Sequence, residues 1–232
     1  MNGNSLTVRR KVSIELGVLA ALTVSFLILW PRRNPFVDVA LAVFALLCIG
    51  ISARYTRRVI WTVSPPPSDA NPSRRAIVAT LWVTVPTVIL FFLIGAILKS
   101  RDNGWAAVGG MLFNWKILAV FGAYVIWALI QQTLFQFYLL GRLLALFPRA
   151  TPLWPLLVTG LGFSLVHLPD IPTTLVTAIA GVVWTVIYYR YRYLLPLAIS
   201  HAALGTAFYY WVCGHDLARE WSMAISKVGL QH

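Results

Sequence analysis

Three glutamines lie in the middle of a long apolar stretch that runs from residue 115 to residue 146. They are Gln131, Gln132 and Gln136. At about 100° per residue, a helix places all three side chains within one arc of its surface. Amides within a bilayer either hydrogen-bond to a neighbouring helix or face a polar site. One glutamine would indicate a helix contact, whereas three on one face favour a site.

Two histidines in later apolar stretches are the candidate partners of these amides. His167 lies in FSLVHLPD and His201 lies in SHAALG. A neutral imidazole can bind a metal, move a proton or donate a hydrogen bond to an oxyanion. A lone histidine in an apolar helix is more often a packing residue, but two of them beside a glutamine face predict one intramembrane site.

Two residues near His167 could assist it. Phe163 precedes His167 by one helical turn and is a candidate for substrate contact. Asp170 follows His167 by three residues. Its carboxylate could act as a base, orient the imidazole or cap the next helix, and capping is the commonest role of an aspartate before a helix.

Gly205 and Arg142 complete the set of candidate site residues. Gly205 lies one turn after His201 and leaves room for a close helix contact or a substrate backbone. Arg142 lies eleven residues after Gln131, at nearly the same azimuth. It could meet a substrate carboxylate or a lipid head group, or it could anchor its helix at the cytoplasmic surface.

The composition indicates an integral membrane protein. The 232 residues are 59% hydrophobic and only 11% charged, whereas a soluble domain is about 25% charged. Several nearly uncharged segments have the length of about 17 to 25 residues that crosses a bilayer. We therefore predict an all-α, polytopic transmembrane helical bundle of about seven spans, with the site in a cavity among the last four. The predicted spans are residues 12–30, 36–52, 76–98, 115–147, 156–168, 172–189 and 194–212.

The net charge of +12 is better explained by basic residues that fix the orientation of the chain in the membrane than by nucleic-acid binding. The basic residues fall in the connections between apolar segments, including a proline-rich loop at residues 53–75. Their distribution favours a multi-pass protein with its N-terminus inside, and we expect the membrane to be a prokaryotic cytoplasmic membrane. The short span at residues 156–168 is the weakest element, and its loss would reverse the orientation of everything after it.

The chain divides into three parts on this interpretation. Residues 1–114 hold the N-terminal spans and loops, residues 115–212 hold the core with the candidate site, and residues 213–232 form a polar tail. Cys48 and Cys213 lie far apart in or beside apolar segments. Their spacing suggests neither a zinc site nor a disulfide framework.

At the glutamines and histidines, the chain resembles the CPBP family of intramembrane proteases, also called the Abi or CAAX-protease family. This family includes the type II CAAX prenyl endopeptidases. Its pattern is EExxxR on one helix, FxxxH on the next, and HxxxN or HxxxD near the end. The corresponding stretches here read QQTLFQ, FSLVH and HAALG. The resemblance covers residues 115–212.

The resemblance implies a site in which the first glutamate activates water and the histidines complete the catalytic group. Here Gln131 and Gln132 take the glutamate positions, Gln136 takes the arginine position and Gly205 takes the last position. Glutamine cannot accept a proton near neutral pH and is a poor metal ligand. A glutamate-based mechanism therefore cannot run through these positions.

Three functions stay open on the sequence alone. The first is an endopeptidase that cleaves membrane-anchored or prenylated peptides, with water held by His167 and His201, Asp170 or an imidazole as base, and the glutamines on the scissile carbonyl. A divalent metal at His167 and His201 is the candidate cofactor. The second is a catalytically inactive relative, a pseudoprotease, that binds a lipid, an isoprenoid or a transmembrane peptide in the same cavity. A small transporter is disfavoured, because no carboxylate for ion coupling and no repeat was recognised within the spans.

Overall fold

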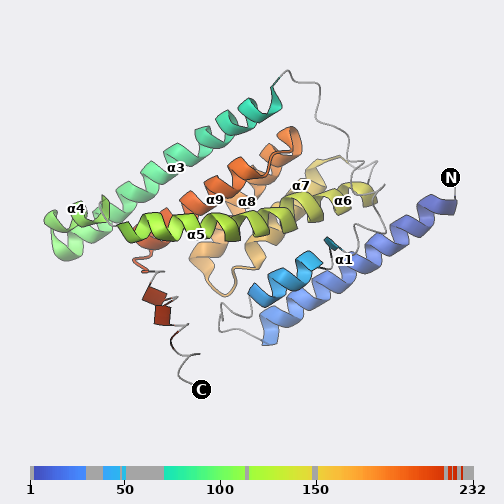
Figure 1. Ribbon diagram of the computed structural model, residues 1–232, viewed down its shortest axis with the longest axis horizontal. Coiled ribbons are helices and arrows are strands. Elements are labelled where there is room, and N and C mark those ends of the chain that lie inside the picture. The colour runs from blue at the N-terminus through green and yellow to red at the C-terminus, as the bar shows by residue number, and fades with distance from the viewer. Residues whose placement is uncertain are drawn as a thin grey trace. The chain divides into compact units, whose positions relative to one another are not determined.

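The computed structural model describes most of the chain, and the described residues form helices and turns with no strand (Figure 1). The described residues are 3–29, 39–47, 49–50, 71–112, 115–147, 151–216, 219–220, 222–223 and 226. The all-α class is therefore confirmed. Most of the proline-rich loop predicted at residues 53–75 and parts of the polar tail lie outside the described residues.

The helices follow the predicted spans closely in the second half of the chain. The span predicted at residues 172–189 is one helix, and the span predicted at residues 115–147 consists of three consecutive helical segments. Two segments, η1 and η2, are π-helices. The elements are α1 (Gly3–Leu29), α3 (Pro72–Asn103), α4 (Ala106–Leu112), α5 (Trp115–Gln132), η1 (Thr133–Leu139), α6 (Leu140–Leu146), α7 (Leu153–Leu165), α8 (Ile171–Tyr191), α9 (Leu195–Ala207) and η2 (Phe208–Val212).

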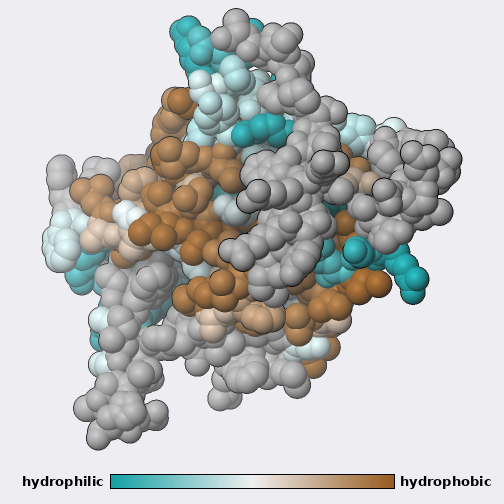
Figure 2. All heavy atoms as spheres, turned by 45° about the vertical axis from the view of Figure 1, so that its right-hand side comes forward, coloured by the Kyte–Doolittle hydropathy of each residue, from teal (hydrophilic) through white to brown (hydrophobic). Residues whose placement is uncertain are grey.

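Three helical stretches are long and apolar enough to cross a membrane: Pro72–Arg101, Val108–Leu146 and Ile171–Tyr191. The helix α7 is also apolar but has only 13 residues. Large hydrophobic side chains on α3, α5 and α8 are exposed, as expected for helices that face lipid. Figure 2 shows that hydrophobic residues cover much of the visible described surface. These features indicate an integral membrane protein, while the total of seven spans and the orientation remain predictions.

The chain forms two compact units that interleave along the sequence. Unit 1 comprises Met1–Pro72 and Ile130–Leu194, and unit 2 comprises Ser73–Leu129 and Leu195–His232. One boundary falls inside α5, so the glutamines belong to unit 1 whereas most of that helix belongs to unit 2.

In unit 1, α7 and α8 cross at two glycines. A Cβ atom on Gly160 would lie 2.6 Å from the Cα atom of Val182, and a Cβ atom on Gly181 would lie 2.5 Å from the carbonyl oxygen of Gly160. These positions allow the two backbones to touch, which is how membrane helices gain van der Waals contact. The same helix α7 packs against η1 through Phe163 and Phe135, whose ring centroids are 5.3 Å apart.

In unit 2, the first part of α5 packs against α9 through small side chains. Ala128, Ala198 and Ala202 form a fully buried cluster that is covered by larger side chains of α5. The helix α3 is joined to α9 by a hydrogen bond of 2.6 Å from the hydroxyl of Thr84 to that of Ser200. These contacts fix the helix that carries His201.

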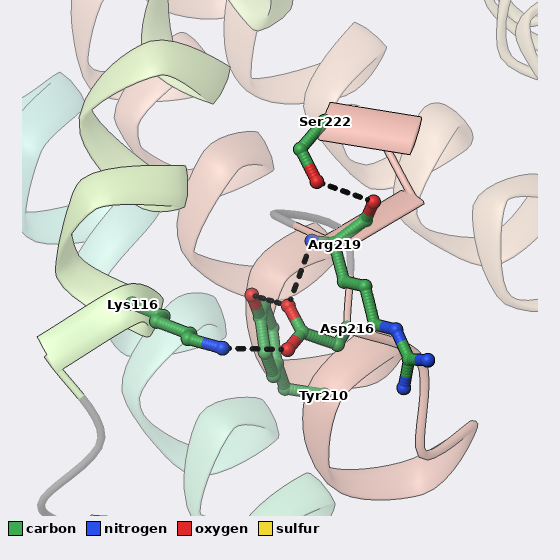
Figure 3. A network of polar contacts seen from close by, with 5 residues as sticks. All are labelled: Lys116, Tyr210, Asp216, Arg219 and Ser222. Atoms are coloured by element: carbon green, nitrogen blue, oxygen red, sulfur yellow. Dashed lines mark hydrogen bonds and ion pairs between the residues drawn. The ribbon is translucent and has the colours of Figure 1, made fainter. Parts of the chain in front are cut away.

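A polar network at the start of α5 holds the segment after η2 (Figure 3). The carboxylate of Asp216 accepts hydrogen bonds from the backbone N–H of Arg219 at 3.1 Å and from the hydroxyl of Tyr210 at 3.0 Å. It also pairs with the Nζ atom of Lys116 at 3.2 Å. The backbone N–H of Arg219 is the main cause that lowers the pKa of Asp216, with Lys116 and Tyr210 acting in the same direction.

The lowered pKa of Asp216 predicts how the attachment of this segment depends on pH. The attachment should be fully present above the ordinary carboxyl pKa of about 4 and should weaken as the pH falls through the lowered value in the folded state. A spin label at residue 222 should therefore gain mobility at low pH. Asp216→Asn should give the mobile spectrum already at pH 7, and a spectrum that stays immobile in this variant would contradict the prediction.

Candidate functional site

The amides of Gln132 and Gln136 are fully buried, and both belong to unit 1. Neither the Oε1 nor the Nε2 atom of either side chain has a hydrogen-bond partner among the described residues. Gln131 differs in degree, because its side chain is partly exposed and only its Oε1 atom is buried without a partner among the described residues. The predicted polar face is therefore centred on Gln132 and Gln136, and Gln131 lies at its edge.

A π-helix begins directly after Gln132 and contains Gln136. Its hydrogen bonds join residues five apart, so each turn holds more residues than an α-helical turn. Residues four apart still lie on one face, which keeps the two amides on the same side of the helix. Short π-helical segments occur often at functional sites, and the second one, η2, begins soon after Gly205.

The buried amides require a polar counterpart. Each glutamine offers two donors and two acceptors, and a buried polar group without a partner costs about 1–3 kcal/mol. Lipid tails supply no hydrogen bonds to offset this cost. The hydroxyl of Thr159 on α7 is also fully buried without a partner among the residues that the structure describes. These groups suit a molecule that both donates and accepts hydrogen bonds, as a peptide backbone does.

His167 lies in the turn after α7, and its contacts define its tautomer. The Nδ1 atom lies 3.1 Å from the carbonyl oxygen of Phe163 and 3.5 Å from the hydroxyl oxygen of Thr177. Because a carbonyl only accepts, Nδ1 carries the proton and the lone pair is on Nε2. The backbone carbonyl of Phe163 thus orients the ring through Nδ1.

An aromatic chain connects His167 to the glutamine segment. The ring of His167 lies 5.3 Å from that of Phe163, and the ring of Phe163 lies 5.3 Å from that of Phe135. Phe135 lies in sequence between the two buried glutamines. Phe163 is fully buried, so its observed contacts are those of a packing residue that positions the histidine and η1.

Asp170 caps α8, which was the favoured of its predicted roles. Its carboxylate accepts hydrogen bonds from the backbone N–H of Thr173 at 3.2 Å and from the hydroxyl of Thr173 at 2.5 Å. Both carboxylate oxygens are thus engaged by the first turn of the helix. The turn that carries His167 is thereby tied to the start of α8.

Asp170→Ala should destabilise the chain by about 1 kcal/mol, because it removes the side-chain acceptor of the helix start. The measurement is thermal unfolding in detergent. Asp170→Asn keeps an acceptor oxygen and should lose much less stability. Equal losses in the two variants would indicate a role that depends on the charge of Asp170 rather than on capping.

Arg142 is buried, and its partner is a residue that we did not predict. Its Nη2 atom lies 3.1 Å from the carboxylate of Glu15 on α1, and its guanidinium lies 5.2 Å from the ring centroid of Tyr138. The hydroxyl of Tyr138 also donates to Glu15. The first predicted span thus contains a carboxylate, which corrects the premise on which a transporter was disfavoured. A single acidic residue within residues 12–30 was the signal for this pair.

His201 and Gly205 lie in unit 2, on the face of α9 that meets α5. The ring of His201 is buried and lies 5.5 Å from that of Tyr124 in an edge-on contact. A Cβ atom on Gly205 would collide with the Tyr124 ring. Gly205 therefore admits a tyrosine side chain, in line with the predicted need for space. Convergence of this unit 2 histidine with the unit 1 residues remains a prediction.

The residues around His167 do not fit a divalent metal. Across the described part of the chain, no three His, Cys, Asp or Glu side chains group as metal ligands. The polar groups in contact with His167 include the carbonyl oxygen of Phe163 and the hydroxyl of Thr177, and the nearby carboxylate of Asp170 is engaged by Thr173. A divalent metal at His167 and His201 remains a prediction.

The central part of the chain is similar to a known family. Residues 113–207 match the family model described as type II CAAX prenyl endopeptidase Rce1-like. This stretch includes the two candidate histidines, His167 and His201, and the three glutamines of the predicted polar face. No curated protein and no solved structure matches the chain.

Proposed function

From the premise that residues 113–207 form a core of the CAAX-protease family, we propose that the chain binds a membrane-anchored or prenylated peptide through the amides of Gln132 and Gln136. One observation carries the proposal: the amide atoms of both side chains are fully buried and have no partner among the described residues. A peptide backbone offers alternating N–H and C=O groups, and these match the donors and acceptors of two glutamines on one helix face.

A hydrophobic substitution tests this proposal, because binding and helix packing predict opposite changes in stability. Gln132→Leu and Gln136→Leu remove the amides and keep similar volume. If the amides serve a ligand, the ligand-free protein should be as stable as the wild type or more stable. Binding of a prenylated peptide in detergent should weaken about tenfold or more for each variant.

Gln131→Leu is the matched control, because Gln131 lies on the same helix but is partly exposed, and only one of its two amide atoms, Oε1, is buried without a partner among the described residues. Gln131→Leu should change the peptide affinity much less than Gln132→Leu does. A marked fall in the melting temperature of Gln132→Leu and Gln136→Leu with unchanged peptide affinity would overturn the proposal, since it would show that the amides hold helices together.

Cleavage of the bound peptide is the second candidate function, and the tautomer of His167 favours it. With the lone pair on Nε2, the imidazole can take a proton from water as the water oxygen attacks the scissile carbonyl carbon. The glutamine N–H groups would donate to the oxygen that becomes negative. The imidazolium would then return its proton to the leaving nitrogen as the C–N bond breaks, which gives a free carboxylate and an amine.

Binding without cleavage is the alternative that the capping of Asp170 favours, because this carboxylate is engaged by Thr173. Cleavage and binding without cleavage are distinguished by incubating the chain with a prenylated peptide and analysing the products by mass spectrometry. Cleavage that is lost in His167→Ala, with binding retained, would establish the peptidase, and His201→Ala would show whether the second histidine takes part. An intact peptide that stays bound to the wild type would establish the pseudoprotease.

A further inference from the structure

The end of α8 has an unusual residue in a conformation that favours glycine. Arg192 is the C-cap of the helix, with φ 60° and ψ 30°, and its N–H bonds to the carbonyl of Tyr188 at 2.8 Å. Among the described residues that are not glycine, it alone has a positive φ. Glycine is the common residue at this position, because a Cβ atom is strained there. An arginine at this position indicates that the guanidinium has a role that offsets the backbone strain.

The guanidinium of Arg192 lies on two aromatic rings and is partly buried. It is 5.6 Å from the ring centroid of Tyr188 and 5.2 Å from that of Tyr189. Burial lowers the pKa of Arg192, and the two tyrosines act in the opposite direction. Cation–π contacts of this kind orient a guanidinium without neutralising it.

The positive charge of Arg192 is not compensated within the described part of the chain. No carboxylate there pairs with it. The Arg192 side chain hydrogen-bonds to that of Tyr188, whereas its Nε atom is buried without a hydrogen-bond partner in that part of the chain. A partly buried cation of this kind gains from an anion that reaches it from outside. Arg190, two residues earlier, is exposed and contacts a different ring, that of Tyr191 at 5.9 Å.

The position of Arg192 indicates which anion is available. It directly follows a helix that is long and apolar enough to cross the membrane and that ends at Tyr191. Tyrosines and arginines at such ends lie at the level of the lipid head groups. A guanidinium presents parallel N–H groups that match two phosphate oxygens. We propose that Arg192, held on Tyr188 and Tyr189, binds the phosphate of an anionic lipid.

An ordinary membrane anchor would not need this arrangement. An arginine that only extends to the water layer can do so from a relaxed helical backbone, as the exposed Arg190 shows. Among the described residues, Arg192 alone combines a strained backbone, contact with two aromatic rings and a charge that no carboxylate pairs. The site is independent of the peptide-binding proposal, because it involves neither the glutamines nor His167.

Substitution by glycine tests the proposal, because it relieves the backbone while it removes the ligand group. The purified, delipidated full chain is titrated with phosphatidylglycerol in detergent, and bound lipid is counted by native mass spectrometry. In Arg192→Gly, the lipid-free protein should melt at the same temperature as the wild type or higher. Its apparent Kd for phosphatidylglycerol should rise about tenfold or more. Arg190→Gln is the matched control and should keep the wild-type affinity.

Two further ligands identify the chemistry and its source. Diacylglycerol, which lacks phosphate, should not bind at this site. Glycerol phosphate tests for a soluble ligand: if it displaces phosphatidylglycerol at a similar concentration, the site takes a soluble phosphate and the lipid assignment is overturned. Wild-type affinity for phosphatidylglycerol in Arg192→Gly, or equal losses in Arg192→Gly and Arg190→Gln, would overturn the site itself.

Discussion

Glu15→Ala should destabilise the chain by about 3–5 kcal/mol, the cost of leaving a buried charge without its partner. Arg142 is only 1% exposed, so its guanidinium cannot turn to water when the carboxylate is lost. The hydroxyl of Tyr138 would lose its acceptor in the same step. The measurement is thermal unfolding in detergent, followed by the loss of helical circular dichroism.

A double variant separates the cost of an unpaired charge from the loss of packing. Glu15→Ala combined with Arg142→Met removes both charges and keeps an unbranched side chain at the buried position. It should regain most of the stability lost in Glu15→Ala, because apolar replacement of a whole buried pair is often neutral or stabilising. A double variant as unstable as Glu15→Ala would show that the ion pair is not the source of the effect.

Gly160→Val should be the second severe substitution, with a loss of about 3 kcal/mol or more, because it overpacks a contact between two backbones. The added Cβ atom would lie 2.6 Å from the backbone of Val182. Neither main chain can move aside as a flexible side chain would. The helices α7 and α8 would have to separate, which should appear as a lower melting temperature in detergent.

Gly162→Ala is the matched control on the same helix. The nearest atom to its added Cβ would be Cδ2 of Leu139 at 3.7 Å, an ordinary contact. Alanine is the better helix former by about 1 kcal/mol, so this variant should be at least as stable as the wild type. If both variants lost the same stability, the close crossing at Gly160 would not be the cause.

The sequence predicts the later helices well because local signals mark their ends. Asp170 and Pro172 are typical of a helix start, and the helix observed is Ile171–Tyr191. Helical periodicity predicts that Gln131, Gln132 and Gln136 share one face. The structure buries Gln132 and Gln136 fully and leaves Gln131 partly exposed, which the periodicity does not predict.

Other features depend on contacts that no local pattern contains. The partner of Arg142 is 127 residues away in the chain, and an arginine near the end of an apolar run is equally typical of a membrane anchor. The π-helices η1 and η2 have the same apolar composition as the α-helices around them. The crossing at Gly160 requires the position of α8, which the sequence of α7 does not specify.

The π-helix η1 also restricts how this chain can change in length. Its wider turns rotate the following helix α6 relative to the position that an uninterrupted α-helix would give it. They therefore set the direction in which Arg142 points. Deletion of one residue within Thr133–Leu139 would turn the following segment by about 100° and carry the guanidinium away from Glu15. Insertions and deletions in this segment are therefore expected to be rarer among homologues than substitutions, because the angular phase between the amides and the ion pair depends on its residue count.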